Sequence, residues 1–211
     1  SASPEGEDTE EMPRPAPRIA LALDESSGAT LSLEAARELV AVAADRDAIF
    51  EALCRGARSR ARFACVLTIH GEVAFGRVAL EDTWLDRQQV GRVSVPLDRP
   101  SVFRQAAKSR QQHIGALGDP AVTNDPLRAL GRRPPLPGAV LPILLRGRPV
   151  ALLYLDDDGR ELSESLASEL QPLLSEVGQA FHRLVQQSKT GGLGGIAELE
   201  DAASPQEVTD T

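Results

Sequence analysis

The sequence predicts an α+β domain with a central antiparallel sheet of about five or six strands and with the N- and C-terminal helices packed on one face. Two observations carry this prediction. Apolar residues recur at three- and four-residue spacing towards both ends of region 18–187, which is typical of amphipathic helices. Short apolar runs bounded by turn residues occupy the middle of the region, which is typical of strands joined in hairpins.

Two helices are predicted at the N-terminal end. Ser32 is suited to cap the first, at about residues 33–44. Asp45 and Asp47 begin the second, where acidic residues at the start and arginines at the end match the helix dipole. The apolar positions of this second helix recur at helical spacing: Ile49, Phe50, Leu53, Cys54 and Ala57.

Strands are predicted next. Residues 63–69 (FACVLTI) and 73–80 form a hairpin with its turn at Gly71, and residues 93–97 form a third strand. A helix capped by Ser101 follows at about 102–110, and the proline-rich residues 115–137 are predicted to be irregular. A second hairpin joins 139–145 to 150–155, and Asp156 to Gly159 form a solvated turn. The last helix spans about 162–187 and contains Pro172.

The charge distribution divides the chain. The formal net charge is −8, and it resides in the two end segments, because residues 18–187 balance their acidic and basic groups. Segment 1–17 is acidic and proline-rich, and 188–211 is acidic and glycine-rich, so both are predicted to be disordered. The neutral middle has no basic stripe, which argues against nucleic acid as a partner.

Other classes of protein are also disfavoured. No apolar run reaches the length of about 18 residues that a membrane span needs, and a basic region followed by an apolar stretch is missing from the N-terminus. Cys54 and Cys65 lie in apolar surroundings and are interpreted as reduced, buried thiols of a cytoplasmic protein.

The order of elements and several local sequences resemble a GAF domain over residues 33–187. These are Val95-Pro96-Leu97 before a helix, Leu141-Pro142-Ile143, the turn at Gly147, and the strand VALLYLDD from Val150. The resemblance is to regulatory modules of bacterial signalling proteins. It implies a domain that binds small molecules or partner proteins and passes a conformational signal along its terminal helices.

The candidate binding residues are polar side chains around the middle helix and the segment after it. Ser101, Arg104, His113, Thr123, Asn124 and Asp125 could contribute to a ligand site. Arg128, Arg132 and Arg133 could meet an anionic ligand or an acidic partner, or could be solvated loop charges. Trp84, in a polar segment, is either an exposed contact residue or a plug that closes the sheet edge.

Catalytic, metal and cofactor chemistry is not predicted. The motifs of hydrolases, zinc proteases, phosphate loops and kinases are missing, and the three histidines lie on separate elements. Bilin-binding relatives attach their chromophore through a cysteine, commonly beside a histidine, whereas both cysteines here lie far upstream of His113. No catalytic residue, metal ligand or cofactor is therefore assigned.

The leading hypothesis is a non-catalytic GAF-like module that acts through protein–protein interaction, either in a signalling pathway or with other domains of a larger protein. A homodimer through the terminal helices is the expected assembly if their apolar positions are not all used by packing on the sheet. The alternative is a nucleotide or metabolite sensor with a pocket between the sheet and segment 101–137.

Overall fold

A computed structural model describes residues 28–118 and 120–191 and contains a six-stranded antiparallel sheet. The strand order across the sheet is β3-β2-β1-β6-β5-β4. The strands are β1 (Phe63–His70), β2 (Val73–Leu80), β3 (Ser94–Pro96), β4 (His113–Ala116), β5 (Pro137–Leu145) and β6 (Arg148–Asp156). The longest strands lie in the middle of the sheet and the shortest at its two edges, so the predicted α+β class and antiparallel sheet are confirmed.

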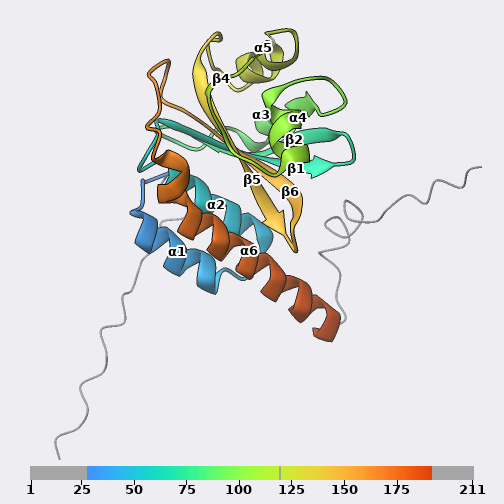
Figure 1. Ribbon diagram of the computed structural model, residues 1–211. Coiled ribbons are helices and arrows are strands. Elements are labelled where there is room, and N and C mark those ends of the chain that lie inside the picture. Colours follow the sequence, from blue (N-terminus) through green and yellow to red (C-terminus); the bar gives the residue numbers. More distant parts are fainter. Residues whose placement is uncertain (1–27, 119, 192–211) are drawn as a thin grey trace, which may run out of the picture.

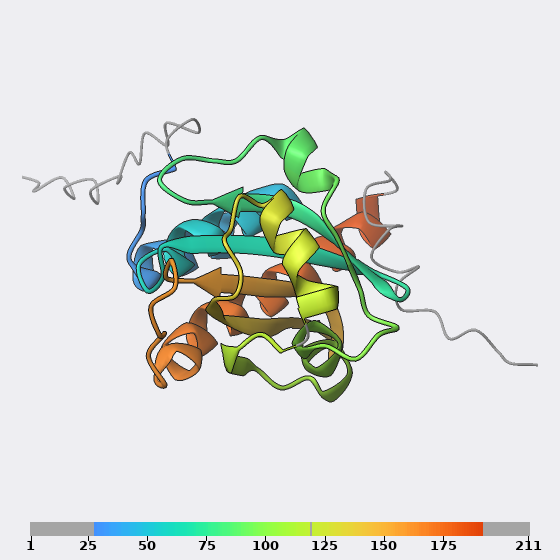
Figure 2. The same cartoon turned by 90° about the horizontal axis from the view of Figure 1, so that it is seen from above.

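Helices cover both faces of the sheet. The first two helices and the last helix lie together on one face, and the three middle helices lie on the other (Figures 1 and 2). The first group is α1 (Leu33–Val42), α2 (Arg46–Ala57) and α6 (Leu166–Gly191), and the second is α3 (Arg87–Gly91), α4 (Val102–Ser109) and α5 (Pro120–Ala129). The terminal helices therefore pack on one face, as predicted.

The predicted caps and turns form by the expected hydrogen bonds. The Ser32 hydroxyl accepts from the backbone N–H of Ala35 at 3.1 Å, and the Ser101 hydroxyl accepts from that of Arg104 at 3.1 Å. Asp45 caps α2 in the same way. The turn between β5 and β6 places Arg146 and Gly147 at positive φ, a two-residue geometry that matches the twist of hairpin strands.

Each face of the sheet has its own apolar core. On the face covered by α1, α2 and α6, here called the helix-layer face, Phe50 and Phe181 meet edge to face, with ring centroids 5.4 Å apart. On the other face, Tyr154 lies 6.0 Å from the rings of both Phe63 and Phe103. Side chains fill the interior on both faces, so a cavity of any size is expected only at the margins of the sheet.

Three parts of the structure differ from the sequence prediction. The segment 115–137 is not irregular, because it holds the end of β4 and all of α5. Helix α6 begins at Leu166 rather than at Leu162, and it continues to Gly191 rather than ending at Gln187. Asp156 is not part of a solvated turn, because it ends β6 and is completely buried. The predicted disordered segment 1–17 and residues 192–211 of the other one lie outside the described residues.

Candidate functional site

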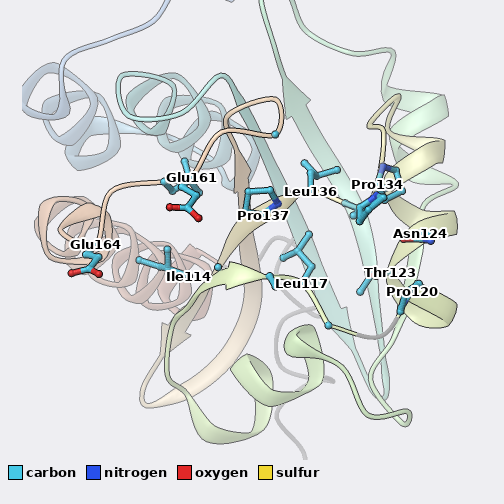
Figure 3. A pocket seen from close by; sticks show the side chains of 17 residues that line it. Ile114, Leu117, Pro120, Thr123, Asn124, Pro134, Leu136, Pro137, Glu161 and Glu164 are labelled. Atoms are coloured by element: carbon cyan, nitrogen blue, oxygen red, sulfur yellow. The ribbon is translucent and has the colours of Figure 1, made fainter.

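A pocket of about 600 Å³ lies at the β4 edge of the sheet and is called the edge pocket here (Figure 3). Four parts of the chain enclose it: β4 with the residues after it, α5, the loop that leads into β5, and the connector 159–164 between β6 and α6. It is lined by Ile114, Gly115, Ala116, Leu117, Gly118, Pro120, Thr123, Asn124, Leu127, Pro134, Pro135, Leu136, Pro137, Gly159, Glu161, Leu162 and Glu164.

One wall of the edge pocket is rich in proline. Pro134, Pro135 and Pro137 form one wall, and proline fixes φ, so little conformational freedom is lost when a ligand binds there. Gly118, with φ of +79°, turns the chain from β4 towards α5 in a conformation that other residues rarely adopt. These walls of the pocket are therefore formed without a ligand.

Most of the lining is apolar, and its polar groups lie at two opposite sides. Thr123 and Asn124 of α5 lie on one side, and Glu161 and Glu164 of the connector lie on the other, beside Ile114 (Figure 3). Thr123 is buried and Asn124 half-buried, whereas both glutamates are exposed. An apolar cavity with a few polar groups is the usual composition of a small-molecule site.

A buried cluster of charges holds the wall of the pocket that enters β5. The Arg132 guanidinium makes two hydrogen bonds to the Asp156 carboxylate, Nε to Oδ2 at 2.9 Å and Nη2 to Oδ1 at 2.6 Å. It donates a third to Glu81 at 2.7 Å and lies 4.5 Å from the centre of the Phe63 ring. The Tyr154 hydroxyl donates to Asp156 at 2.8 Å, so the carboxylate is fully engaged.

The charges in this cluster favour one ionisation state. Burial alone lowers the pKa of Arg132, but the hydrogen bonds and negative charge of Asp156 outweigh it and raise that pKa above its ordinary value. Burial, followed by the charge of Asp156, raises the pKa of Tyr154 well above its ordinary value. The arginine stays cationic and the tyrosine stays a hydrogen-bond donor, which keeps the cluster closed.

The predicted binding residues are spread over several places. Asn124 and Thr123 line the edge pocket. Ser101 and Arg104 border a second, shallower hollow beside α4, where Ser101 also serves as the helix cap. His113 lies on β4, with its Nε2 2.7 Å from the Ala116 carbonyl oxygen. The structure thus brings two of the predicted polar residues to the pocket and leaves these three outside it.

The remaining predicted residues are three arginines and a tryptophan. Arg132 is neither a solvated loop charge nor open to a ligand, because it is buried against Asp156. Arg128 is exposed and lies 3.5 Å from Asp125, and Arg133 is exposed. Trp84 is half-buried, bridges to Leu80 beside the end of β2, and packs against the helix-layer core. This half-buried position agrees better with a residue that closes the sheet edge than with a fully exposed contact residue.

Sequence reasoning missed Glu161 and Glu164. The last helix was predicted to begin at about residue 162, so Glu161 would lie just before it and Glu164 in its first turn. Acidic residues are common there because they complement the helix dipole. The helix begins later, at Leu166, and the preceding residues form the connector that faces the pocket. The consecutive turn residues Asp157, Asp158 and Gly159 were the signal that the chain leaves β6 without entering a helix at once.

The thiols and the metal-binding residue types do not form a second site. Cys54 and Cys65 are free and completely buried, and burial raises the pKa of both thiols. Neither lines the edge pocket. Among residues 28–118 and 120–191, no three His, Cys, Asp or Glu side chains converge as a metal site would require, and no helix is both long and apolar enough to cross a bilayer.

Comparison with known proteins identifies the fold. Neither a family model nor a curated protein matches the sequence. Among solved structures, the GAF domain of a phosphoenolpyruvate-protein phosphotransferase from Coxiella burnetii is 12% identical, with a TM-score of 0.60 over 76% of this chain and 95% of that one. The GAF domain of the cyanobacteriochrome TePixJ is 20% identical, with a TM-score of 0.56 over 70% and 95%.

The same fold also occurs in an enzyme. The free methionine-R-sulfoxide reductase of Neisseria meningitidis, solved in complex with its substrate, is 15% identical, with a TM-score of 0.55 over 73% of this chain and 88% of that one. This chain therefore has a GAF-like fold, and the likeness establishes the fold alone.

Proposed function

We propose that this protein is a non-catalytic regulatory module that binds a small molecule in the edge pocket and passes the binding event to helix α6. The observation that carries the proposal is the composition of the pocket wall. One wall is the connector 159–164, which leads directly into α6 at Leu166. A ligand in the pocket would contact the connector at the N-terminal end of α6, and a GAF-like module is expected to signal through its terminal helices.

The size and frame of the pocket support small-molecule binding. Its volume of about 600 Å³ falls within the roughly 300–1,000 Å³ of ordinary ligand sites. The rigid proline wall and the Arg132–Asp156 ion pair hold the surrounding loops in place without a ligand. The complex of the Neisseria meningitidis reductase with its substrate gives one example of a small molecule bound to a protein of this fold.

Two side chains connect the pocket with the helix layer. Ile114 and Leu162 line the pocket and also pack against the apolar core beneath α1, α2 and α6. A ligand that shifts either side chain changes the packing on both sides at once, because protein cores are close-packed. This shared contact gives a route from the pocket to the helices that does not depend on a large loop movement.

Thermal stability tests the binding step with the full 211-residue chain. A screen of nucleotides, amino acids and other metabolites should find a compound that raises the melting temperature in a saturable manner. Asn124→Trp should abolish that rise, because the indole would fill the pocket from α5. Gln88→Trp, at an exposed position of α3 that does not line the pocket, is the matched control and should keep it. An equal rise in both variants would place the ligand elsewhere and contradict the proposal.

Hydrogen exchange tests the transmission step. Saturation with the compound found in the screen should slow amide exchange in the connector 159–164 and in the first turns of α6. Protection confined to α5 and β4 would show that ligand binding does not affect α6. The proposed signal transmission would then be wrong, whereas the proposed ligand binding would still stand.

The non-catalytic part of the proposal rests on chemistry rather than on fold. The sequence carries none of the catalytic motifs considered above, and both of its cysteine thiols are buried with raised pKa values. The lack of a disulfide between these two buried cysteines also supports a cytoplasmic location.

Contact between two copies of the chain is a second candidate function, favoured by the outward face of the helix layer. The charged residues of α6 between 168 and 187, Glu169, Glu176 and Arg183, are only partly exposed. The fully exposed positions of this stretch are uncharged: Ser168, Gln171, Pro172, Ser175, Gln179, His182, Gln186 and Gln187. Val42, at the end of α1, is 78% exposed. Uncharged residues cost less to desolvate than ions, so this face is suited to helix pairing.

Light scattering coupled to size exclusion tests this second candidate. A dimer should form at micromolar concentration and should dissociate when the pair Ser175→Glu and Gln179→Glu places negative charge on the outward face of α6. The pair Gln88→Glu and Gln105→Glu adds the same negative charge at exposed positions of α3 and α4, on the opposite face of the sheet, and is the control for altered net charge. A monomer at all concentrations would contradict the second candidate.

A further inference from the structure

We infer that the ligand of the edge pocket is a small molecule with a positive charge on an apolar body, and that Glu161 and Glu164 receive the charge. This inference rests on the proposed function, because it names the class of ligand for the same pocket. Among the described residues, the ionisable groups that line the pocket are these two glutamates, and the rest of the lining is apolar, backbone or neutral polar.

Both carboxylates are available to a ligand. They are exposed, and among the described residues neither forms an ion pair or a hydrogen bond with another side chain. Both residues line the same pocket, so a cation bound there would be attracted by two negative charges. Surface glutamates with this freedom can turn towards a bound ammonium or guanidinium group.

Two of the nearby cations are already paired. Arg128 pairs with Asp125, and Arg132 is enclosed by Asp156 and Glu81. Arg133 and Arg160 are neighbours in sequence of lining residues, yet both are exposed and neither lines the pocket. An anionic ligand, such as a nucleotide or a carboxylate metabolite, would therefore meet two negative charges and no lining cation among the described residues.

The arrangement also fixes an orientation. The glutamates lie on the connector side, beside Ile114, and Leu117, Leu136 and Pro137 lie between them and α5 (Figure 3). A ligand that places its cation at the connector puts its apolar body against these three side chains. Its far end then meets Asn124, whose amide can donate or accept a hydrogen bond.

Glu164 has a second role that the experiment must separate. It lies just before the first turn of α6, where the helix dipole favours a negative charge. Replacing it by glutamine can therefore lower the stability of the fold without any effect on a ligand. Melting temperatures of each variant without ligand measure that contribution independently.

Three probes with the same indole body distinguish the effect of ligand charge on affinity from the effect of ligand shape. Tryptamine is cationic, tryptophol is neutral and indole-3-acetate is anionic. Each is titrated into the ¹⁵N-labelled full chain, and dissociation constants are taken from amide shifts of the pocket residues. Tryptamine should bind about five-fold more tightly than tryptophol, the gain expected of a partly exposed ion pair. Indole-3-acetate should bind more weakly than either, and added salt should reduce the difference.

The double substitution Glu161→Gln and Glu164→Gln should bring the three dissociation constants to within about two-fold of one another, since the indole body keeps its contacts. The pair Glu38→Gln and Asp98→Asn changes the net charge equally at exposed sites that do not line the pocket and should leave the preference intact.

The outcomes separate the two proposals. If all three probes bind in the pocket with equal affinity, or if indole-3-acetate binds most tightly, the charge inference is wrong. The proposed pocket function then still stands. Amide shifts that map outside the pocket, or no shifts with any probe at millimolar concentration, overturn the charge inference, and the melting-temperature screen with Asn124→Trp decides the pocket function separately. A tryptamine preference that survives in the double glutamine variant overturns the assignment to Glu161 and Glu164.

Discussion

The guanidinium of Arg132 and the carboxylate of Asp156 form a two-point ion pair between residues 24 positions apart in the chain. Their side chains are 4% and 0% exposed. The pair joins the loop after α5 to the end of β6, and both segments continue into walls of the edge pocket. The pair therefore holds the loop after α5 to the sheet.

Loss of Arg132 should be costly. Arg132→Met keeps the length and apolar contacts of the side chain but leaves the Asp156 charge buried without its partner. We expect the free energy of unfolding, measured in urea, to fall by about 3–5 kcal/mol. Adding Asp156→Asn should recover part of the loss, because the amide carries no charge and its oxygen still accepts from Tyr154.

Arg128→Met is the matched control for this prediction. Arg128 is an exposed arginine of the same region, paired with Asp125 at 3.5 Å, and its removal should change stability by no more than about 0.5 kcal/mol. Equal losses for the two arginines would show that the buried pair contributes no more than a surface pair.

Gly76 of β2 should not tolerate a side chain. A Cβ at this position would lie 2.2 Å from the carbonyl oxygen of Val90 in α3, and a backbone atom cannot move aside cheaply. Gly76→Ala should destabilise the fold by about 1–3 kcal/mol in chemical unfolding. Gly91→Ala, next to Val90 but with no neighbouring atom within 4 Å of the position its Cβ would take, should be neutral or slightly stabilising. The reverse order would contradict the close approach of α3 to β2.

The two thiols should be inert in the folded protein. Both are completely buried, and burial raises the pKa of each, so the reactive thiolate is scarce and out of reach. Ellman's reagent should detect almost no thiol in the native chain at about pH 8 and two per chain in guanidinium chloride. Rapid reaction of either cysteine without denaturant would show that its core opens readily.

Asp47 should contribute stability that depends on pH. Burial alone raises its pKa, but hydrogen bonds and charges from Arg77 and Arg87 outweigh this and lower the pKa below 3.8. A lowered pKa in the folded state stabilises the fold above the pKa of the unfolded chain, and this contribution is lost as the pH falls through the folded value.

The test compares the wild type with Asp47→Asn over a pH series. Because Asp47 is partly exposed, we expect a difference of no more than about 1 kcal/mol in the free energy of unfolding at about pH 7. The difference should shrink as the pH falls from about 5 towards about 3. A difference that grows on acidification would show that the arginines do not stabilise the carboxylate.

The sequence was sufficient to predict elements with strong local signals. The caps at Ser32 and Ser101, the hairpin at Gly147 and the buried runs of β1 and β6 all follow from side-chain chemistry within a few residues. Helix α5 was missed because Pro126 and several weak helix formers argue against a helix locally. Burial of Val122 and Leu127 against the rest of the domain overrides that preference.

The pocket was only partly predictable for a related reason. Asn124 was a candidate because it is polar and lies in a proline-rich segment. Glu161 and Glu164 line the same cavity but come from the connector that follows β6, after the β5–β6 hairpin. Nothing in the local sequence indicates that proximity. Likewise, Arg132 resembles any other loop arginine until the fold places Asp156 beside it.

The short strands at the margins of the sheet bear on how the protein behaves at high concentration. β3 has three residues and β4 has four, so each sheet edge offers few free backbone groups to another chain. Beyond the end of β4, the open side of β5 contains Pro142, which has no N–H to donate. Intermolecular strand pairing, the usual first step of β-aggregation, is thereby discouraged at both margins. The sheet is therefore poorly suited to extend from one molecule to the next.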